Sequence, residues 1–303
     1  MLRPNMLGLA SQLMQKRNIL NSPRITELKR KKRKIFIRKI LIFVFGFLII
    51  IVALSYVSRI KRLNISEVDI TGNNIIDTHL LKTTVENEIT GNYLWVFPKT
   101  NILFYPKNRI KNELSNQFKR LKDITLNIKD RQILEISVTE RSGKYIWCGE
   151  TVNLESKPQI EKCYFLDDEG YIFDEAPYFS GEVYFKFYGY VDLTDGLPTG
   201  SYFFKENFKN VILFKQMLEG TDVKPVAFYM QKNGDIKMLL SKENKLPANP
   251  EIRFKTNADL EKVVENLKVA LDTEPLKSEF KTKYSSLLYI DLRFGNKVYY
   301  KFK

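Results

Sequence analysis

The residues that could carry out chemistry are few in this chain. Among 303 residues there is one histidine, His79, and there are two cysteines, Cys148 and Cys163. A Ser-His-Asp or Cys-His arrangement would have to use His79, which falls near the start of an expected helix, where a solvated side chain is the ordinary state. Two cysteines and one histidine, far apart in the sequence, are also too few soft ligands for a zinc site.

One acidic segment resembles a cation site at first reading. Residues 167–174, "DDEGYIFD", carry four carboxylates. They lack the alternating ligand spacing of a calcium-binding loop, so a charged turn between strands is the better interpretation. The sequence also has no glycine-rich phosphate-binding loop. We therefore expect a protein that is not an enzyme and that holds no metal or cofactor.

The charge of the chain is concentrated at its beginning. The formal net charge is +14, but residues 1–39 contain 12 Lys and Arg against one acid, whereas the other 264 residues contain 37 basic and 34 acidic residues. A nucleic-acid-binding domain would carry its positive charge on the folded part. A membrane-anchored DNA-binding protein stays a minor alternative, and a basic tail is the simpler interpretation.

An apolar segment follows the basic tail directly. Residues 40–58 contain no charged residue, and 19 residues in a helix just cross the hydrocarbon layer of about 30 Å. The basic residues 29–39 precede it and few follow, which predicts a cytoplasmic tail at 1–39, a transmembrane helix at 40–58 and export of the remainder. A cleaved signal peptide is the alternative, with a cleavage site near residues 53–55, but the long leader and long apolar segment favour an uncleaved anchor.

The two cysteines fall on the expected exported side, where thiols oxidise. Cys148 ends one strand-like segment, "KYIWC", and Cys163 begins another, "CYFLD". A disulfide there would staple the base of a hairpin loop, and in the chain-entropy model it would add about 3 kcal/mol. Two buried free thiols are the other possibility.

The exported part divides into two regions by pattern. Residues 63–141 predict the order β-α-α-β-β, with helical spacing of Leu81, Val85 and Ile89 and period-2 alternation at 124–128 and 134–138. This gives two helices on a three-stranded sheet. Residues 144–303 predict short aromatic-rich strands, a hairpin around Asn233-Gly234, and helices at 208–218 and 257–271 with Asn257 as N-cap. The fold class is α+β.

The chain ends on a second hairpin, "YIDLRFGNKVYYKFK", in which residues 288–293 and 298–302 alternate around the turn Gly295-Asn296. Lysines on the last strand protect this edge only partly against pairing with another chain, and its aromatic residues favour such pairing. Such a strand can accept a partner strand. The alternatives are an ordinary edge, or one covered by residues 281–289. The candidate partner-binding residues on this last strand are Lys297, Val298, Tyr299, Tyr300 and Phe302.

Four motifs in order carry a resemblance to a known family. They are "VDITGNN" at 68–74, "LEISVTERS" at 134–142, an Asp-x-x-Gly segment at 167–170, and "DLRF" at 291–294. With a single anchor and a basic tail, the chain resembles the FtsQ/DivIB bacterial cell division proteins over about residues 30–303. Ser142-Gly143 stand where the family usually has a proline. The resemblance adds Arg293 and Phe294 to the candidate partner-binding residues, because they stand where the family has an Arg-Tyr pair, with phenylalanine in place of the tyrosine.

The resemblance implies a fold and a role. It implies a POTRA domain at 63–141, an FtsQ-type β domain at 144–303, and a bitopic protein of the bacterial inner membrane at the division septum. It also implies that the terminal strand binds a bitopic partner of the FtsB/DivIC type in a complex with an FtsL-like protein. The alternatives are an extracytoplasmic sensor or regulator, and an assembly factor for outer-membrane proteins, which is disfavoured because no barrel-like strands follow.

Overall fold

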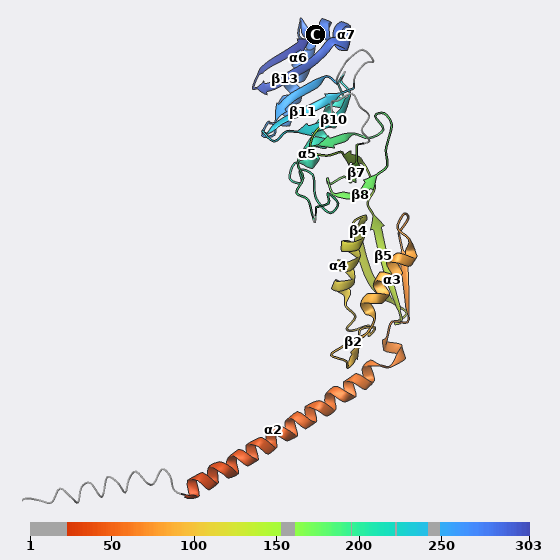
Figure 1. The fold of residues 1–303 in the computed structure, drawn as a ribbon, viewed down its shortest axis with the longest axis vertical. Coiled ribbons are helices and arrows are strands. Elements are labelled where there is room, and N and C mark those ends of the chain that lie inside the picture. The colour runs from red at the N-terminus through yellow and green to blue at the C-terminus, as the bar shows by residue number, and fades with distance from the viewer. Residues whose placement is uncertain (1–22, 153–160, 195, 222, 242–248) are drawn as a thin grey trace, which may run out of the picture. The chain divides into compact units, whose positions relative to one another are not determined.

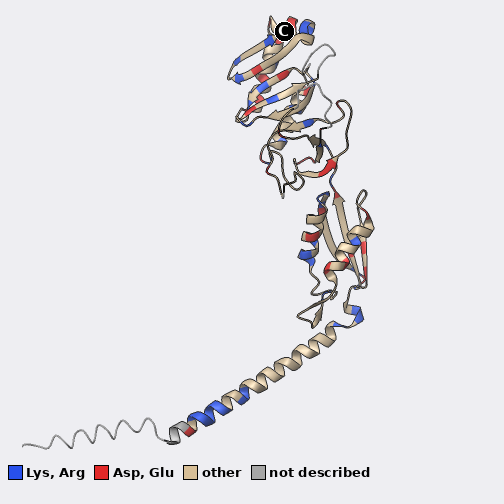
Figure 2. Ribbon diagram, in the orientation of Figure 1, with Lys and Arg blue, Asp and Glu red and all other residues tan. Residues whose placement is uncertain are grey.

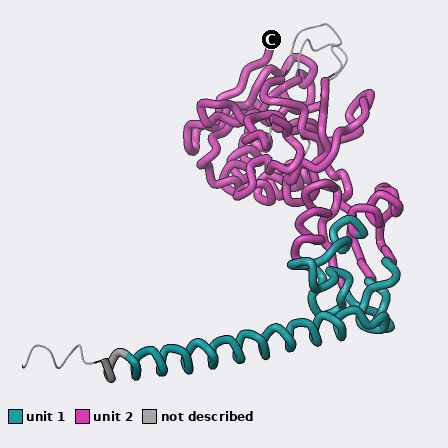
Figure 3. The backbone as a smooth tube through the Cα atoms, turned by 60° about the horizontal axis from the view of Figure 1, so that its bottom comes forward, with its two compact units in different colours: residues 1–68, 86–106, 127–134 teal, residues 69–85, 107–126, 135–303 magenta. Residues whose placement is uncertain are grey.

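The structure is a computed structural model that describes residues 23–152, 161–194, 196–221, 223–241 and 249–303. The first 22 residues of the expected cytoplasmic tail lie outside this range. The chain forms two compact units, one of residues 1–68, 86–106 and 127–134 and the other of residues 69–85, 107–126 and 135–303 (Figure 3).

The first unit begins with one long helix, α2, Pro23–Ser58. Lys and Arg occupy its earlier part and uncharged residues its later part (Figure 2). Apolar side chains of the later part are exposed, Phe43 by 76% for example. Asn64 closes the helix, because its side-chain amide donates to the carbonyl oxygens of Ser58 at 2.9 Å and Ile60 at 2.8 Å. The helix is long and apolar enough to cross a membrane.

Five strands and two helices follow α2 and a short 3-10 turn at Lys61–Leu63. They are β1 Glu67–Thr71, α3 Thr78–Ile89, β2 Asn92–Tyr93, β3 Phe97–Pro98, α4 Lys107–Gln117, β4 Leu121–Lys129 and β5 Ile133–Glu140. The three longer strands form a sheet in the order β1-β5-β4, while β2 and β3 form a small hairpin (Figure 1). The strands β2 and β3 between the two helices were not expected from the sequence.

Residues with the expected spacing are buried in this region. In the second unit, Leu81 and Val85 of α3 and Ile110 and Leu114 of α4 are fully buried. Gly72 ends β1 with a φ of +88°, and a Cβ there would lie 2.1 Å from the carbonyl oxygen of Val138. Glycine is thus required in the "TGNN" segment for both conformation and space.

The second unit also contains a nine-stranded sheet, in the order β14-β13-β12-β11-β10-β9-β6-β7-β8. The strands are β6 Tyr145–Trp147, β7 Cys163–Leu166, β8 Ile172–Ala176, β9 Lys186–Tyr188, β10 Pro225–Met230, β11 Asp235–Leu240, β12 Glu251–Lys255, β13 Leu287–Phe294 and β14 Lys297–Phe302. Neighbours are antiparallel except for the parallel pairs β6–β9, β9–β10 and β12–β13. The expected mixed α+β fold, with a C-terminal part that is mostly sheet, is confirmed.

Three helices cover one face of this sheet: α5 Phe208–Glu219, α6 Leu260–Asp272 and α7 Leu276–Lys283. Under them, residues paired in register form a continuous row across the strands. The row consists of Tyr300, Ile290, Ile252, Met238, Phe228 and Phe187. Its five members on β13 to β9 are completely buried and belong to one core cluster.

Two details of the helices differ from the prediction. Asp259, not Asn257, caps α6, because the Asp259 carboxylate accepts the N–H groups of Glu261 and Lys262. Helix α7 was not expected, because its sequence "LKSEFKTK" is mostly polar. Only Leu276 and Phe280 are buried there, one turn apart.

Ion pairs within the second unit join residues in or next to β4 and β5 to the acidic segment 167–174. Arg141 pairs with Asp167, and both side chains are nearly buried, at 11% and 2% exposed. Arg120 pairs with Asp174 at 2.5 Å, where the carboxylate is 46% exposed. Lys122 pairs with Asp168 at 3.1 Å. Three cations of this chain therefore pair with the acidic segment.

Candidate functional site

The candidate site is the free edge of β14 at one end of the large sheet (Figure 1). A two-residue loop, Gly295-Asn296, joins β13 to β14, and Phe294 pairs with Lys297 across it. Gly295 has a φ of +65°, which suits the tight turn. Residues 281–289 do not cover β14, because they end α7 and run into β13, and the N–H of Lys303 donates to the carbonyl of Ser286 on that side.

The opposite edge of the sheet, β8, is covered by the chain at its first residue, Ile172. The N–H of Ile172 donates to the carbonyl of Ser201 at 2.9 Å, and Gly200 donates to the carbonyl of Ile172 at 2.8 Å. Strand β14 differs. Among the described residues, none beyond β13 forms a backbone hydrogen bond with Lys297–Phe302. Every second residue of such a strand directs its N–H and C=O groups outward. The edge at β14 is thus open for pairing.

The two faces of β14 have different surroundings. Val298, Tyr300 and Phe302 are half-buried and pack against the core beneath the helices. Tyr300 and Phe302 also contact each other edge to face, with ring centroids 5.7 Å apart. Lys297 and Tyr299 lie on the other face and are exposed. Of the predicted residues on this strand, three therefore have a packing role and two are accessible.

An exposed aromatic pair lies beside the turn. Phe294 is 56% exposed and Tyr299 is 50% exposed. Their rings form an edge-to-face contact with centroids 5.3 Å apart and planes at 85°. Exposed aromatic side chains held rigidly in this way are typical anchors of protein interfaces. The pair adds a specific contact surface to the open backbone of β14.

Arg293 is engaged within the chain. Its guanidinium donates to the Asp291 carboxylate at 2.9 and 2.6 Å and to Asp235 on β11 at 2.6 Å. Burial alone would raise the pKa of Asp291, but the hydrogen bonds from Arg293 outweigh it and hold that pKa below its ordinary value. Arg293 therefore holds β13 against β11. Of the two neighbouring residues Arg293 and Phe294, Phe294 is the one accessible to a partner.

The structure adds neighbours that sequence patterns did not indicate. Arg253 on β12 lies over the ring of Tyr289, 4.1 Å from its centroid, and Tyr289 pairs in register with Lys301. In the same face of the sheet, Tyr299, Asp291 and Arg253 are successive register partners. The order of the strands places Arg253 and Tyr299 on either side of Asp291. Periodicity along the sequence does not indicate this order.

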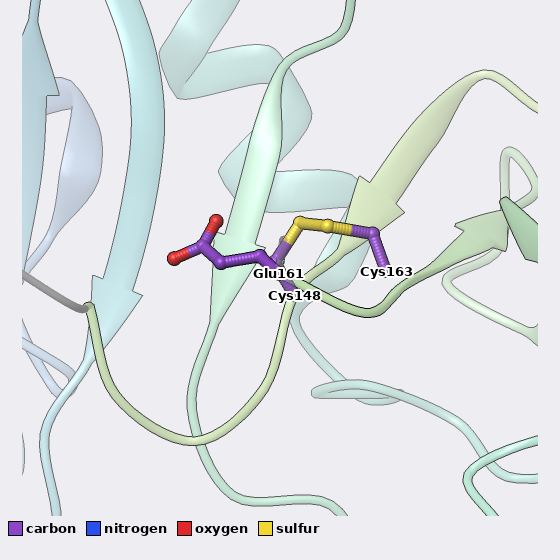
Figure 4. Close-up of side chains that lie close together, drawn as sticks. All are labelled: Cys148, Glu161 and Cys163. Atoms are coloured by element: carbon purple, nitrogen blue, oxygen red, sulfur yellow. A yellow bond between two sulfur atoms is a disulfide. The ribbon is translucent and has the colours of Figure 1, made fainter. Parts of the chain in front are cut away.

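The other residues considered for chemistry have structural surroundings. His79 is exposed, and its backbone N–H donates to the Asp77 carboxylate at the start of α3. Cys148 and Cys163 form a disulfide with Cα atoms 4.2 Å apart, and Glu161 lies beside them (Figure 4). Sulfurs bonded to each other are not thiolate ligands. Glu161 accepts the hydroxyl of Tyr188 at 3.0 Å, and burial raises the pKa of that hydroxyl.

A comparison with models of known protein families finds no match, and no curated protein sequence matches the chain. The fold and the site alone define the class: a mixed α+β protein with an apolar N-terminal helix long enough to span a membrane.

Proposed function

We propose that this chain is a non-enzymatic membrane scaffold of the bacterial division machinery, of the FtsQ/DivIB type. It recruits FtsB/DivIC-like and FtsL-like partners by strand addition at β14. The observation that carries the proposal is the difference between the two sheet edges. Residues 200–201 cover the start of β8 at Ile172, whereas the described residues leave β14 open along its length beside an exposed aromatic pair.

The arrangement of the first unit supports the membrane part of the proposal. Basic residues 29–39 and the apolar residues 40–58 belong to one helix. This polarity favours a cytoplasmic N-terminus, with residues after 59 outside. In the proposed role the protein lies in the bacterial inner membrane and gathers at the division septum. The Cys148–Cys163 disulfide agrees with a non-reducing compartment. In this scheme residues 63–141 act as the POTRA domain near the membrane.

The edge also restricts the chemistry of the partner. Lys297 and Lys301 are exposed on β14, and Lys303 follows them. An added strand would bring its own side chains about 5 Å from these lysines. Carboxylates in the partner would relieve the repulsion between the lysines. We expect an extended partner segment with acidic residues at alternate positions and an apolar residue against Phe294 and Tyr299.

Site-specific crosslinking in cells tests the proposal. A photoreactive residue at Tyr299 or Lys301 should crosslink to a DivIC- or FtsB-like partner, and Phe294→Ala should weaken the crosslink. The matched control is a photoreactive residue at Leu213 on α5, which is 56% exposed but lies away from β14. Equal crosslinking from all three positions, or none from β14 in dividing cells, would reject the docking edge.

An extracytoplasmic regulator is a second candidate, because α2 continues through the basic segment and links the two sides of the membrane directly. In that case the cytoplasmic tail would carry a signal. A chain that lacks residues 1–28 and still supports normal septum formation would argue for the scaffold and against the regulator.

A further inference from the structure

A small hairpin in the first unit exposes unusually apolar residues at its tip. Strands β2 and β3 are joined by Leu94, Trp95 and Val96, and Leu94 and Trp95 are 86% and 91% exposed. Both also have positive φ values, +46° and +65°. Non-glycine residues seldom adopt this conformation, and it costs free energy. The chain thus maintains a strained turn that holds two large apolar side chains away from its core.

A second loop exposes further apolar residues nearby. Leu103 is 73% exposed and Phe104 is 57% exposed. The ring of Phe104 contacts that of Phe97 on β3, with centroids 6.4 Å apart. The hairpin 92–98 and the loop 101–105 therefore form one exposed apolar surface, called here the membrane-facing loops.

The membrane-facing loops are fastened to the end of α2. The hydroxyl of Ser55 donates to the carbonyl of Val96 at 3.0 Å, and the side-chain amide of Asn101 donates to the carbonyl of Ser58 at 3.0 Å. Asn101 is only 1% exposed, so this second contact is shielded from water. All these residues belong to the first unit.

The backbone strengthens the same connection. Ile65 donates to the carbonyl of Thr100 at 2.9 Å, and Ile102 donates to that of Leu63 at 3.0 Å. The loops are therefore held directly against the segment that leaves α2, and they adjoin its end (Figure 1).

These contacts determine the depth of the loops relative to the helix. Ser55 lies three residues before the end of α2, which is about 4.5 Å along the axis. If residues 40–58 span the hydrocarbon layer, their last turn lies at its boundary with the headgroups. The carbonyl of Val96 is at that level. Tryptophan favours this interface, where its ring is apolar and its N–H stays hydrated.

We propose that the membrane-facing loops insert into the outer-leaflet interface of the phospholipid bilayer beside α2. The inference rests on the proposed membrane span and not on the partner proposed for β14. A lipid surface is the occupant that the structure favours, because the loops are continuous with a helix whose apolar side chains are themselves exposed. Arg59, Lys61 and Arg62 follow the helix at once and suit anionic headgroups.

The chain contains two tryptophans, which makes a direct test possible. Trp147 is 7% exposed and its indole N–H donates to the carbonyl of Gly189. A full-length Trp147→Phe variant therefore reports on Trp95 alone. It is reconstituted into phosphatidylcholine–phosphatidylglycerol vesicles, with or without lipids brominated near the headgroup. We expect Trp95 emission to be lost in the brominated vesicles and protected from aqueous iodide in the unbrominated ones.

Two matched variants control this measurement. The Trp95→Phe chain reports on the buried Trp147, whose emission should be the same in both kinds of vesicle. Leu94→Asp in the Trp147→Phe background places a charge at the exposed tip, outside the core, and should restore much of the lost Trp95 emission.

Distinct results overturn the inference. If the protein floats with the vesicles but Trp95 keeps its emission and remains open to iodide, α2 spans the bilayer while the loops stay in water. If Trp95 then becomes protected from iodide when a partner protein is added, the loops bind that protein and not the lipid. A chain that fails to float with the vesicles contradicts the membrane span, and this inference falls with it.

Discussion

At the scale of single residues, two neighbouring tyrosines of β14 have opposite roles. Tyr300 is half-buried and belongs to the row of side chains under the helices, whereas Tyr299 is half-exposed and its ring contacts that of Phe294. The alternation of a strand separates adjacent residues in this way. A substitution at Tyr299 therefore tests partner binding, and a substitution at Tyr300 tests the stability of the fold.

We expect Tyr299→Glu to abolish partner capture while changing the free energy of unfolding by no more than about 0.5 kcal/mol. Tyr300→Glu should instead destabilise the chain by about 2–4 kcal/mol, because it places a charge against the core. Urea denaturation and partner pull-down on the same two variants check this. A stable Tyr300→Glu chain, or a destabilised Tyr299→Glu chain, would contradict the assignment of the two faces.

The disulfide is a second feature at this scale. It closes a separation of 15 residues between Cys148 and Cys163. Replacing both cysteines by serine should lower the free energy of unfolding by about 3 kcal/mol, because the unfolded chain regains the entropy of an open loop. Urea denaturation measures the loss, and wild-type protein in reductant should show the same midpoint as the variant. If reductant leaves the midpoint unchanged, the bridge does not stabilise the fold.

At the scale of elements, the carboxylate of Glu140 at the end of β5 holds the loop before α3. Three consecutive backbone N–H groups, of Asn74, Ile75 and Ile76, donate to it at 2.8, 3.0 and 3.0 Å. Burial by itself would raise the pKa of Glu140, but these donors outweigh it and lower that pKa. The negative charge thus orients a turn that positions a helix.

This arrangement predicts a dependence of stability on pH. Because the folded pKa of Glu140 is lowered, its contribution is complete above the unfolded value of about 4.3 and is lost as the pH falls through the lower folded value. The unfolding midpoint in urea, measured from pH 6 downward to roughly pH 3, should fall less steeply for Glu140→Gln than for wild type. Parallel curves for the two chains would exclude this role.

At the scale of the whole molecule, the ion pairs of the second unit connect the three-stranded sheet region to the large sheet. The Arg141–Asp167 pair is nearly buried, while Asp174, the partner of Arg120, is almost half exposed. The cost of removing one member of a pair depends on whether water can solvate the other. These two ion pairs therefore contribute differently to the free energy of unfolding, although each consists of an arginine and an aspartate.

Arg141→Met should lower the free energy of unfolding by about 3–5 kcal/mol, because it leaves the Asp167 carboxylate buried without its cation. Arg120→Met is the matched control and should cost about 1 kcal/mol or less, since Asp174 can be solvated. Urea denaturation of the two variants gives the comparison. Equal losses would show that burial does not separate the two pairs.

Much of the fold was predictable from local pattern, and the site was predictable only in part. Helices α5 and α6 and the hairpin β13–β14 follow from apolar spacing and a Gly-Asn turn, which are properties of neighbouring residues. Helix α7 was missed because only Leu276 and Phe280 anchor it. The ion pair that holds Arg293 against Asp235 and the coverage of β8 by residues 200–201 are contacts between distant segments, and no periodicity encodes them.

The unequal ends of the large sheet also limit how the protein can assemble. Within the large sheet, β14 is the more open end, since residues 200–201 already bond the outward backbone groups of Ile172 at the start of β8. Two molecules joined through their last strands would form a closed pair, because each has then used its β14. Pairing through β14 therefore yields dimers and not fibres.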